Sequence, residues 1–161
     1  MLVAAACALR EVDLEAVLIG NAGAAIQGAP VTTVDLDFLF RKTPRNLQKL
    51  RALADWLHAT ILRPYYPVSD LFRVVRERDG LQLDFMGTVH GLRSFEGVRD
   101  RARVVDIDGA PLLVAALADI IKSKRAAARP QDLAVLPLLE LAREAAEQDA
   151  KKDARRAPKG K

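Results

Sequence analysis

The sequence predicts a mixed α+β protein, with a mixed β-sheet flanked by helices and two more helices at the C-terminal end. Three observations predict this class. Residues 33–40 form a β-branched and aromatic run with period-2 alternation. The apolar runs 71–77 and 81–86 flank an Asp-Gly pair, which is typical of a tight hairpin turn. Leucines at helical spacing follow Thr43-Pro44.

The first 60 residues are expected to alternate helices and strands. The residue before Pro44 is Thr43, which suits an N-cap, and Pro44 suits the first helical position. The run EAVLIG reads as a short buried strand that ends at Gly20. The expected elements are helix 2–14, strand 15–20, helix 22–29, strand 33–40 and helix 44–59.

The rest of the chain begins with the hairpin and ends with helices. Pro64 and Pro67 mark a loop before the hairpin, and Pro111 is expected to open a long helix. A final helix should carry Pro137 near a kink. The expected elements are strands 71–77, 81–86 and 102–107, a loop with a short helix over 88–100, and helices 111–127 and 131–149.

The expected organisation is an α/β core over 1–110, a helical pair packed on it over 111–149, and a basic, disordered tail over 150–161. The net charge of +4 comes from the end of the chain, because 151–161 hold six Lys/Arg and one Asp. The other residues hold 19 basic and 20 acidic side chains. The alternative for the tail is attraction to a phosphate backbone. Basic residues also cluster within the core, between Arg41 and Arg51, and these clusters favour RNA as a partner.

The composition excludes several classes. With 161 residues, of which 50% are hydrophobic, the chain is long enough for a real core. Its purely apolar runs are too short for a transmembrane helix. We therefore expect a cytoplasmic protein without membrane association. A single cysteine, Cys7, excludes a disulfide framework, and two histidines leave little for a His-rich metal site.

Two acids interrupt the apolar strand V-D-L-D-F-L-F. Alternation sends Leu36 and Phe38 to one face and Asp35, Asp37 and Leu39 to the other. Side chains two apart on a strand start roughly 6.5–7 Å apart, so their carboxylates can converge on cations about 3.5–4 Å apart. The alternative is a solvent-facing edge strand that tolerates acids.

Asp84 is a third acid within an apolar strand, L-Q-L-D-F-M. If strands 33–40 and 81–86 are sheet neighbours, Asp84 completes an oxygen-rich site with Asp35 and Asp37 that suits Mg²⁺. Separately, Gly20-Asn21 ends a strand and opens a small-residue helix, a place where backbone N–H groups bind phosphate. Each signal alone is equally compatible with ordinary surface alternation or an ordinary turn.

Together, these features resemble the nucleotidyltransferase-fold superfamily, and more narrowly the small abortive-infection nucleotidyltransferase toxins. The segment VLIGNAGAAIQGAPVTTVDLDFLF is similar to the core motif of that group through Gly20, Gly28, Thr33, Asp35 and Asp37. Asp84 stands where the third catalytic acid is expected. The stretch DIIKSKRAAARPQDL resembles a helical K-x(n)-R-x-x-D element through Lys122, Arg129 and Asp132. Asn21 departs from the Gly or Ser usual at its position.

The resemblance implies a nucleotidyltransferase-like sheet and an enzyme that transfers a nucleoside monophosphate from a nucleoside triphosphate, such as ATP, with Mg²⁺ or Mn²⁺ as cofactor. It implies that Asp35, Asp37 and Asp84 are the catalytic and metal-binding residues. The implied nucleotide-binding residues are Gly20, Asn21, Thr33, Lys122 and Arg129.

The expected acceptor is a hydroxyl of a macromolecule, either RNA such as tRNA or a protein. The resemblance to toxins also implies a toxin–antitoxin pair with an antitoxin partner. Asn21 instead favours a catalytically silent member that only binds nucleotide or a partner. A third reading, a small-molecule transferase of the antibiotic-modifying type, usually requires a longer chain for its acceptor pocket.

Overall fold

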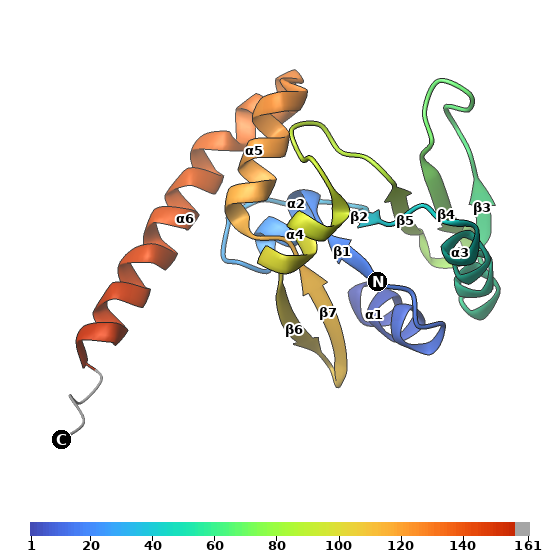
Figure 1. The fold of residues 1–161 in the computed structure, drawn as a ribbon, viewed down its shortest axis with the longest axis horizontal. Helices are drawn as coiled ribbons and strands as arrows, with labels where there is room; N and C mark the ends of the chain where they lie inside the picture. Colours follow the sequence, from blue (N-terminus) through green and yellow to red (C-terminus); the bar gives the residue numbers. More distant parts are fainter. Residues whose placement is uncertain (157–161) are drawn as a thin grey trace.

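The structure is a computed structural model that describes residues 1–156 (Figure 1). Its centre is a seven-stranded mixed sheet in the order β3-β4-β5-β2-β1-β7-β6. The strands are β1 (Ala16–Leu18), β2 (Leu36–Phe40), β3 (Thr60–Leu62), β4 (Phe72–Arg76), β5 (Leu81–Met86), β6 (Arg103–Ile107) and β7 (Ala110–Val114). The predicted α+β class is therefore confirmed.

Six helices in the described residues cover the two faces of the sheet. They are α1 (Leu2–Glu11), α2 (Gly20–Ala25), α3 (Pro44–Trp56), α4 (Phe95–Arg101), α5 (Leu117–Ala127) and α6 (Pro130–Arg156). One face packs against α1 and α3, and the other against α2, α4, α5 and the first turns of α6. The predicted start of α3 is confirmed, because Thr43 Oγ1 accepts a hydrogen bond from the Asn46 N–H and Pro44 opens the helix.

Alternation along β2 sorts its side chains between these two layers, as the sequence predicts. Leu36 and Phe38 belong to the core under α1 and α3, where the Phe38 ring stacks on Phe85 with centroids 5.0 Å apart. Leu39 belongs to the opposite core, with Val17 of β1. Asp37 therefore projects from the face that carries α2 and α5.

The strand pairing places the ends of β1 and β2 together. β1 runs antiparallel to β2 and parallel to β7, and β2 runs parallel to β5. The C-terminal end of β1 thus lies beside the start of β2. The predicted neighbourhood of strands β2 and β5 is confirmed, with Asp37 directly opposite Asp84. The predicted hairpin is β4–β5, which turns through Gly80.

The expected helix from residue 111 is wrong, because 110–114 form strand β7. A second Asp-Gly turn, Asp108-Gly109, joins β6 to β7, and Gly109 adopts a positive φ of 81° there. Pro111 is tolerated because it precedes Leu113, where the pairing with β1 begins. The expected boundary at 110/111 thus falls inside the sheet. The three-residue strand β3 is a further element that the sequence did not predict.

The last helix is longer than expected. α6 contains Pro137 and continues to Arg156, so residues 150–156, expected to be disordered, are helical. The rest of the expected tail, 157–161, lies outside the described residues. The second half of α6 extends away from the sheet (Figure 1). In the described part of the chain, none of the helices is long and apolar enough to cross a membrane.

Candidate active site

Three carboxylates converge on the face of the sheet that carries α2 and α5. Asp37 lies in β2, Asp84 faces it from β5, and Asp35 lies just before β2. One carboxylate oxygen from each residue lies within 4.8 Å of the other two. The structure therefore brings together all three acids that the sequence singles out.

Each carboxylate has a different environment. The hydroxyl of Thr33 donates a hydrogen bond of 2.8 Å to Asp35, and Gln82 Nε2 donates a longer one of 3.3 Å. Asp84 accepts two hydrogen bonds from Arg73, a residue of β4. Among the residues that the structure describes, none donates to the carboxylate of Asp37. The cluster thus has one unpartnered carboxylate between two held ones.

Burial, together with the negative charges of Asp35 and Asp84, raises the pKa of Asp37 to about 6. The cluster lacks positive charge at its centre. A divalent cation supplies that charge, and carboxylate oxygens are the ligands that Mg²⁺ and Mn²⁺ prefer. The donor set and its electrostatics therefore fit such a cation.

Gly20 lies against the cluster. Its φ is +65°, and a Cβ added there would lie 2.3 Å from Asp37 Oδ2. Only glycine allows the start of α2 to approach the carboxylate this closely. Next to it, Asn21 Nδ2 donates to the Thr32 carbonyl at 3.2 Å, while Asn21 Oδ1 is buried and lacks a partner in the described residues. The Asn21 side chain therefore helps to hold the loop before β2 through its amide N–H.

Two cations and an acid face the cluster from α5, the α5–α6 link and α6: Lys124, Arg129 and Asp132. Asp132 is buried and accepts hydrogen bonds from Lys124 at 3.2 Å and from Arg129 at 2.6 Å. Burial opposes ionisation of Asp132, but these two bonds outweigh it and hold its pKa below the ordinary value. Lys124 and Arg129 also lower the pKa of Asp37, so their charge reaches the acid cluster.

These groups line one cavity of about 660 Å³. Gly20, Asn21, Thr33 and Arg129, all predicted site residues, line it together with the three acids. Lys122 does not: it is exposed, and Lys124 occupies the wall instead. Side chains two positions apart on a helix point in directions that differ by about 200°. Lys122 therefore lies on the opposite side of α5 from Lys124.

Sequence reasoning missed Lys124 and Arg73 as members of this cavity. For Lys124 a signal existed, because a buried helix face through Ile120 and Ile121 fixes which lysine of K-S-K turns inward. For Arg73 the signal was weaker. Only the register of the β4–β5 hairpin places Arg73 opposite Asp84.

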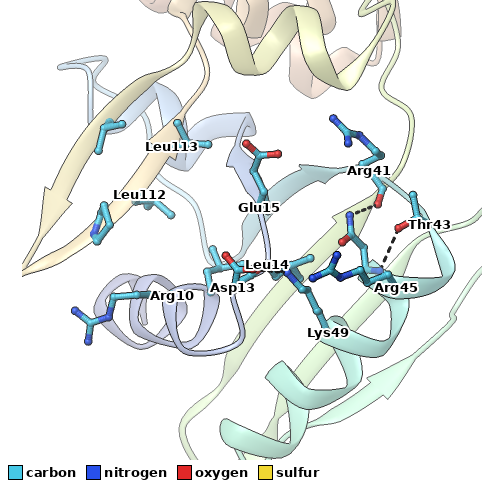
Figure 2. Close-up of a pocket in the computed structure, with 15 residues that line it drawn as sticks. Arg10, Asp13, Leu14, Glu15, Arg41, Thr43, Arg45, Lys49, Leu112 and Leu113 are labelled. Carbon is cyan, nitrogen blue, oxygen red and sulfur yellow. Dashed lines mark hydrogen bonds and ion pairs between the residues drawn. The ribbon is translucent and has the colours of Figure 1, made fainter.

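A second cavity, also of about 660 Å³, lies at the other end of β1 and β2 (Figure 2). Its rim carries four basic side chains, Arg10, Arg41, Arg45 and Lys49. Two acids line it as well, and Asp13 accepts a hydrogen bond of 2.7 Å from Lys49. This cavity holds part of the basic cluster noted in the sequence.

No family model and no curated protein matches this chain. Solved structures do. ANT(2'')-Ia in complex with adenylyl-2''-tobramycin is 17% identical with a TM-score of 0.59, over 94% of this chain and 92% of that one. The lincosamide antibiotic adenylyltransferase LnuA, lincomycin-bound, is 13% identical with a TM-score of 0.57, over 82% and 89%. TM1012 of Thermotoga maritima, a candidate nucleotidyltransferase, is 16% identical with a TM-score of 0.53, over 94% and 89%.

At these identities the likeness shows the fold alone. The chain has the nucleotidyltransferase fold. A functional argument rests on its own acid cluster.

Proposed function

We propose that this protein is a metal-dependent nucleotidyltransferase that moves a nucleoside monophosphate from a nucleoside triphosphate to a hydroxyl of a macromolecular acceptor. One observation carries the proposal. Three carboxylates lie within 4.8 Å of one another, and Gly20, Lys124 of α5 and Arg129 of the α5–α6 link line the same cavity. An acidic centre between a close-approach glycine and two cations suits a triphosphate and its counter-ion.

Asp35, Asp37 and Asp84 would hold Mg²⁺ or Mn²⁺. When bound, that cation neutralises phosphate charge and favours attack at the α-phosphorus. Asp84 is also the proposed general base, and the acceptor hydroxyl would approach from the β4 side of the cluster, away from Gly20 and the triphosphate. The bond from the acceptor oxygen to the α-phosphorus forms as the bond to the pyrophosphate oxygen breaks.

The triphosphate is proposed to lie between Gly20 and α5. Gly20 and Asn21 would contact its phosphates through backbone N–H groups, although α2 spans six residues and contributes only a short dipole. Lys124 and Arg129 would stabilise the charge that develops on the leaving pyrophosphate. Asp132 holds both cations in place. Lys124 takes over here the part expected of Lys122.

Basic side chains in the second cavity favour RNA, such as tRNA, as the macromolecular acceptor. Arg45 lines that cavity, is exposed, and has no ion-pair partner in the described residues, so it is available to a phosphate (Figure 2). Arg10 and Arg41 line the same rim. A protein acceptor, or an antitoxin that covers the cavity, would need to match this positive rim with acidic groups.

A small-molecule acceptor of the antibiotic type is the second candidate. The expectation that such enzymes need a longer chain is wrong for this fold, because this chain covers 92% of the length of ANT(2'')-Ia. The size of the chain therefore does not separate the two acceptor classes. The third candidate, a silent nucleotide-binding member, rests on Asn21, whose side chain is engaged with the loop at Thr32.

The test is a transfer assay. Purified protein with Mg²⁺ or Mn²⁺ and each α-labelled nucleoside triphosphate is mixed with total RNA, with cell protein and with an aminoglycoside and a lincosamide. Label that moves to RNA or protein supports the proposal. Label that moves only to an antibiotic contradicts the proposed macromolecular acceptor. Asp35→Ala is the inactive variant, and Asp55→Asn, an exposed acid of α3 outside both cavities, is the matched control.

Binding without transfer identifies the silent alternative. If no label moves but a fluorescent nucleoside triphosphate binds in a magnesium-dependent way, the chain is a binding module. If the triphosphate does not bind at all, the proposed function is wrong.

A further inference from the structure

Arg73 holds Asp84 with both ends of its guanidinium fork. The Arg73 Nε–H donates to Asp84 Oδ1 at 2.8 Å, and Nη2 donates to Oδ2 at 2.7 Å. The side chain of Asp84 is 7% exposed and that of Arg73 is 26% exposed. A bidentate pair of this geometry is among the strong ion pairs that a carboxylate forms with a side chain.

This pair conflicts with the use proposed for Asp84. Both oxygens of Asp84 already accept hydrogen bonds, whereas the carboxylate of Asp37 has no partner among the described residues and Asp35 accepts only from neutral groups. A guanidinium and a divalent cation at the same carboxylate repel each other. The two cannot both bind Asp84 at full strength.

We propose that Arg73 is a positioning residue that competes with the divalent cation for Asp84 and thereby sets the metal affinity of the site. This inference rests on the proposed function. Arg73 holds Asp84 against β4 until a cation takes the carboxylate, and then turns its guanidinium into the cavity. The cavity gives it space, because Arg73 lines it beside Tyr65 and Ser69, on the side opposite Gly20.

The released guanidinium then faces the side on which an acceptor enters. A planar cation there binds a phosphate bidentately and repels a polycation. The competition thus couples two events: occupation of the metal site and exposure of a cation to an anionic acceptor.

The experiment measures Mn²⁺ affinity of the full chain by electron paramagnetic resonance, without nucleotide. Arg73→Gln removes the competitor and should bind Mn²⁺ about tenfold more tightly than the unchanged protein. Arg73→Lys keeps the charge but loses the fork, so its affinity should lie between the two. Asp84→Asn should bind more weakly than all of them.

Arg76→Gln is the matched control. Arg76 lies in the same strand and holds Asp79 in the same bidentate way, at 2.9 and 2.8 Å, but does not line the cavity. Its Mn²⁺ affinity should equal that of the unchanged protein. Equal or weaker binding by folded Arg73→Gln overturns the inference, and if that variant does not fold, Arg73→Lys decides in the same way.

A second readout follows Arg73 itself. In ¹H–¹⁵N spectra its Nε–H should be protected from exchange without metal and lose protection on addition of Mg²⁺. Persistent protection at saturating Mg²⁺ also overturns the inference. If none of the proteins binds Mn²⁺, the proposed metal site fails as well, whereas binding that Arg73 does not affect leaves the proposed function standing.

Discussion

The two cavities have the same volume but handle charge in opposite ways. At the second cavity most charges are matched: Lys49 binds Asp13, and Arg41 binds Glu96 at 2.9 Å. At the acid cluster three carboxylates meet, and one of them, Asp37, has no partner in the described chain. Matched charges stabilise a surface. Like charges held close together lower stability, and such a cluster indicates a functional site.

The comparison predicts that transfer depends on the acids of the cluster and does not depend on exposed acids elsewhere in the chain. Asp35→Ala and Asp84→Asn should each reduce transfer by at least about a hundredfold, because metal binding and proton acceptance are lost. The thermal midpoint of Asp35→Ala should stay near that of the unchanged protein, whereas Asp84→Asn, which loses the ion pair with Arg73, should stay folded with a lower midpoint. Transfer at the unchanged rate in either variant, measured beside Asp55→Asn, would remove the acid cluster from the mechanism.

The close contact at Gly20 gives the next largest effect. Gly20→Ala combines a strained positive φ with a clash against Asp37, and should lower the free energy of unfolding by on the order of 2–3 kcal/mol. Gly28→Ala is the matched control, because Gly28 also has a positive φ but nothing lies within 4 Å of the added Cβ. That variant should lose only about 1 kcal/mol. Equal losses in urea unfolding would contradict the proposed contact.

Burial of Asp37 and repulsion from its two neighbouring acids should appear together as a pH dependence of stability. The pKa of Asp37 is raised from 3.8 to about 6, so the stabilising effect of its proton is full below pH 3.8 and disappears as the pH rises through 6. Without metal, the free energy of unfolding should rise by on the order of 1–2 kcal/mol between pH 8 and pH 5.

Asp37→Asn should abolish that rise, and Mg²⁺ should stabilise the unchanged protein more at pH 8 than at pH 5. Unfolding in guanidinium chloride at the two pH values, with and without Mg²⁺, measures the pH-dependent rise and the stabilisation by Mg²⁺. A flat profile in the unchanged protein would show that neither burial nor repulsion disfavours the charged form of Asp37.

Two lysines of α5, two positions apart, differ in their relation to the acid cluster: Lys124 lines the cavity and Lys122 does not. Lys124→Met should weaken transfer about tenfold, because it removes a cation that faces the cluster with 12% of its side chain exposed. Lys122→Met should leave transfer unchanged, since Lys122 lies outside the cavity. Steady-state rates at varied nucleoside triphosphate compare the two, and the opposite ranking would restore the assignment made from sequence.

The smallest effect is expected at the second cavity. Arg45→Gln should reduce RNA binding severalfold and lower the slope of log affinity against log salt by about one, because one phosphate contact is lost. Transfer to a short hydroxyl acceptor should not change. Filter binding at several salt concentrations measures the slope, and an unchanged slope would show that the RNA lies elsewhere.

Local sequence patterns predicted the site better than they predicted its partners. Alternation in β2 placed Asp35 and Asp37 on one face, and Thr43-Pro44 fixed the start of α3, because both patterns act within a few residues. Arg73 could not be assigned from sequence, since its contact with Asp84 depends on the register between two strands.

The errors have physical causes of the same kind. The run after Pro111 was short and apolar, and such a run fits a buried strand as well as a helix. The turn at Asp108-Gly109 is the local signal that favours the strand. The resemblance to a K-x(n)-R-x-x-D element selects Lys122, and that motif carries no information about which face of α5 is buried.

The length of α6 makes the protein easy to label. Asp132 binds Lys124 and Arg129 near the start of this helix, and Lys152 lies 20 residues further on, about 30 Å along the axis. Cys7 is the single cysteine of the chain, so a cysteine introduced at position 152 adds only one more thiol. A fluorophore attached there would change its tumbling when a large acceptor arrives at the cavity, and would leave the cavity itself untouched.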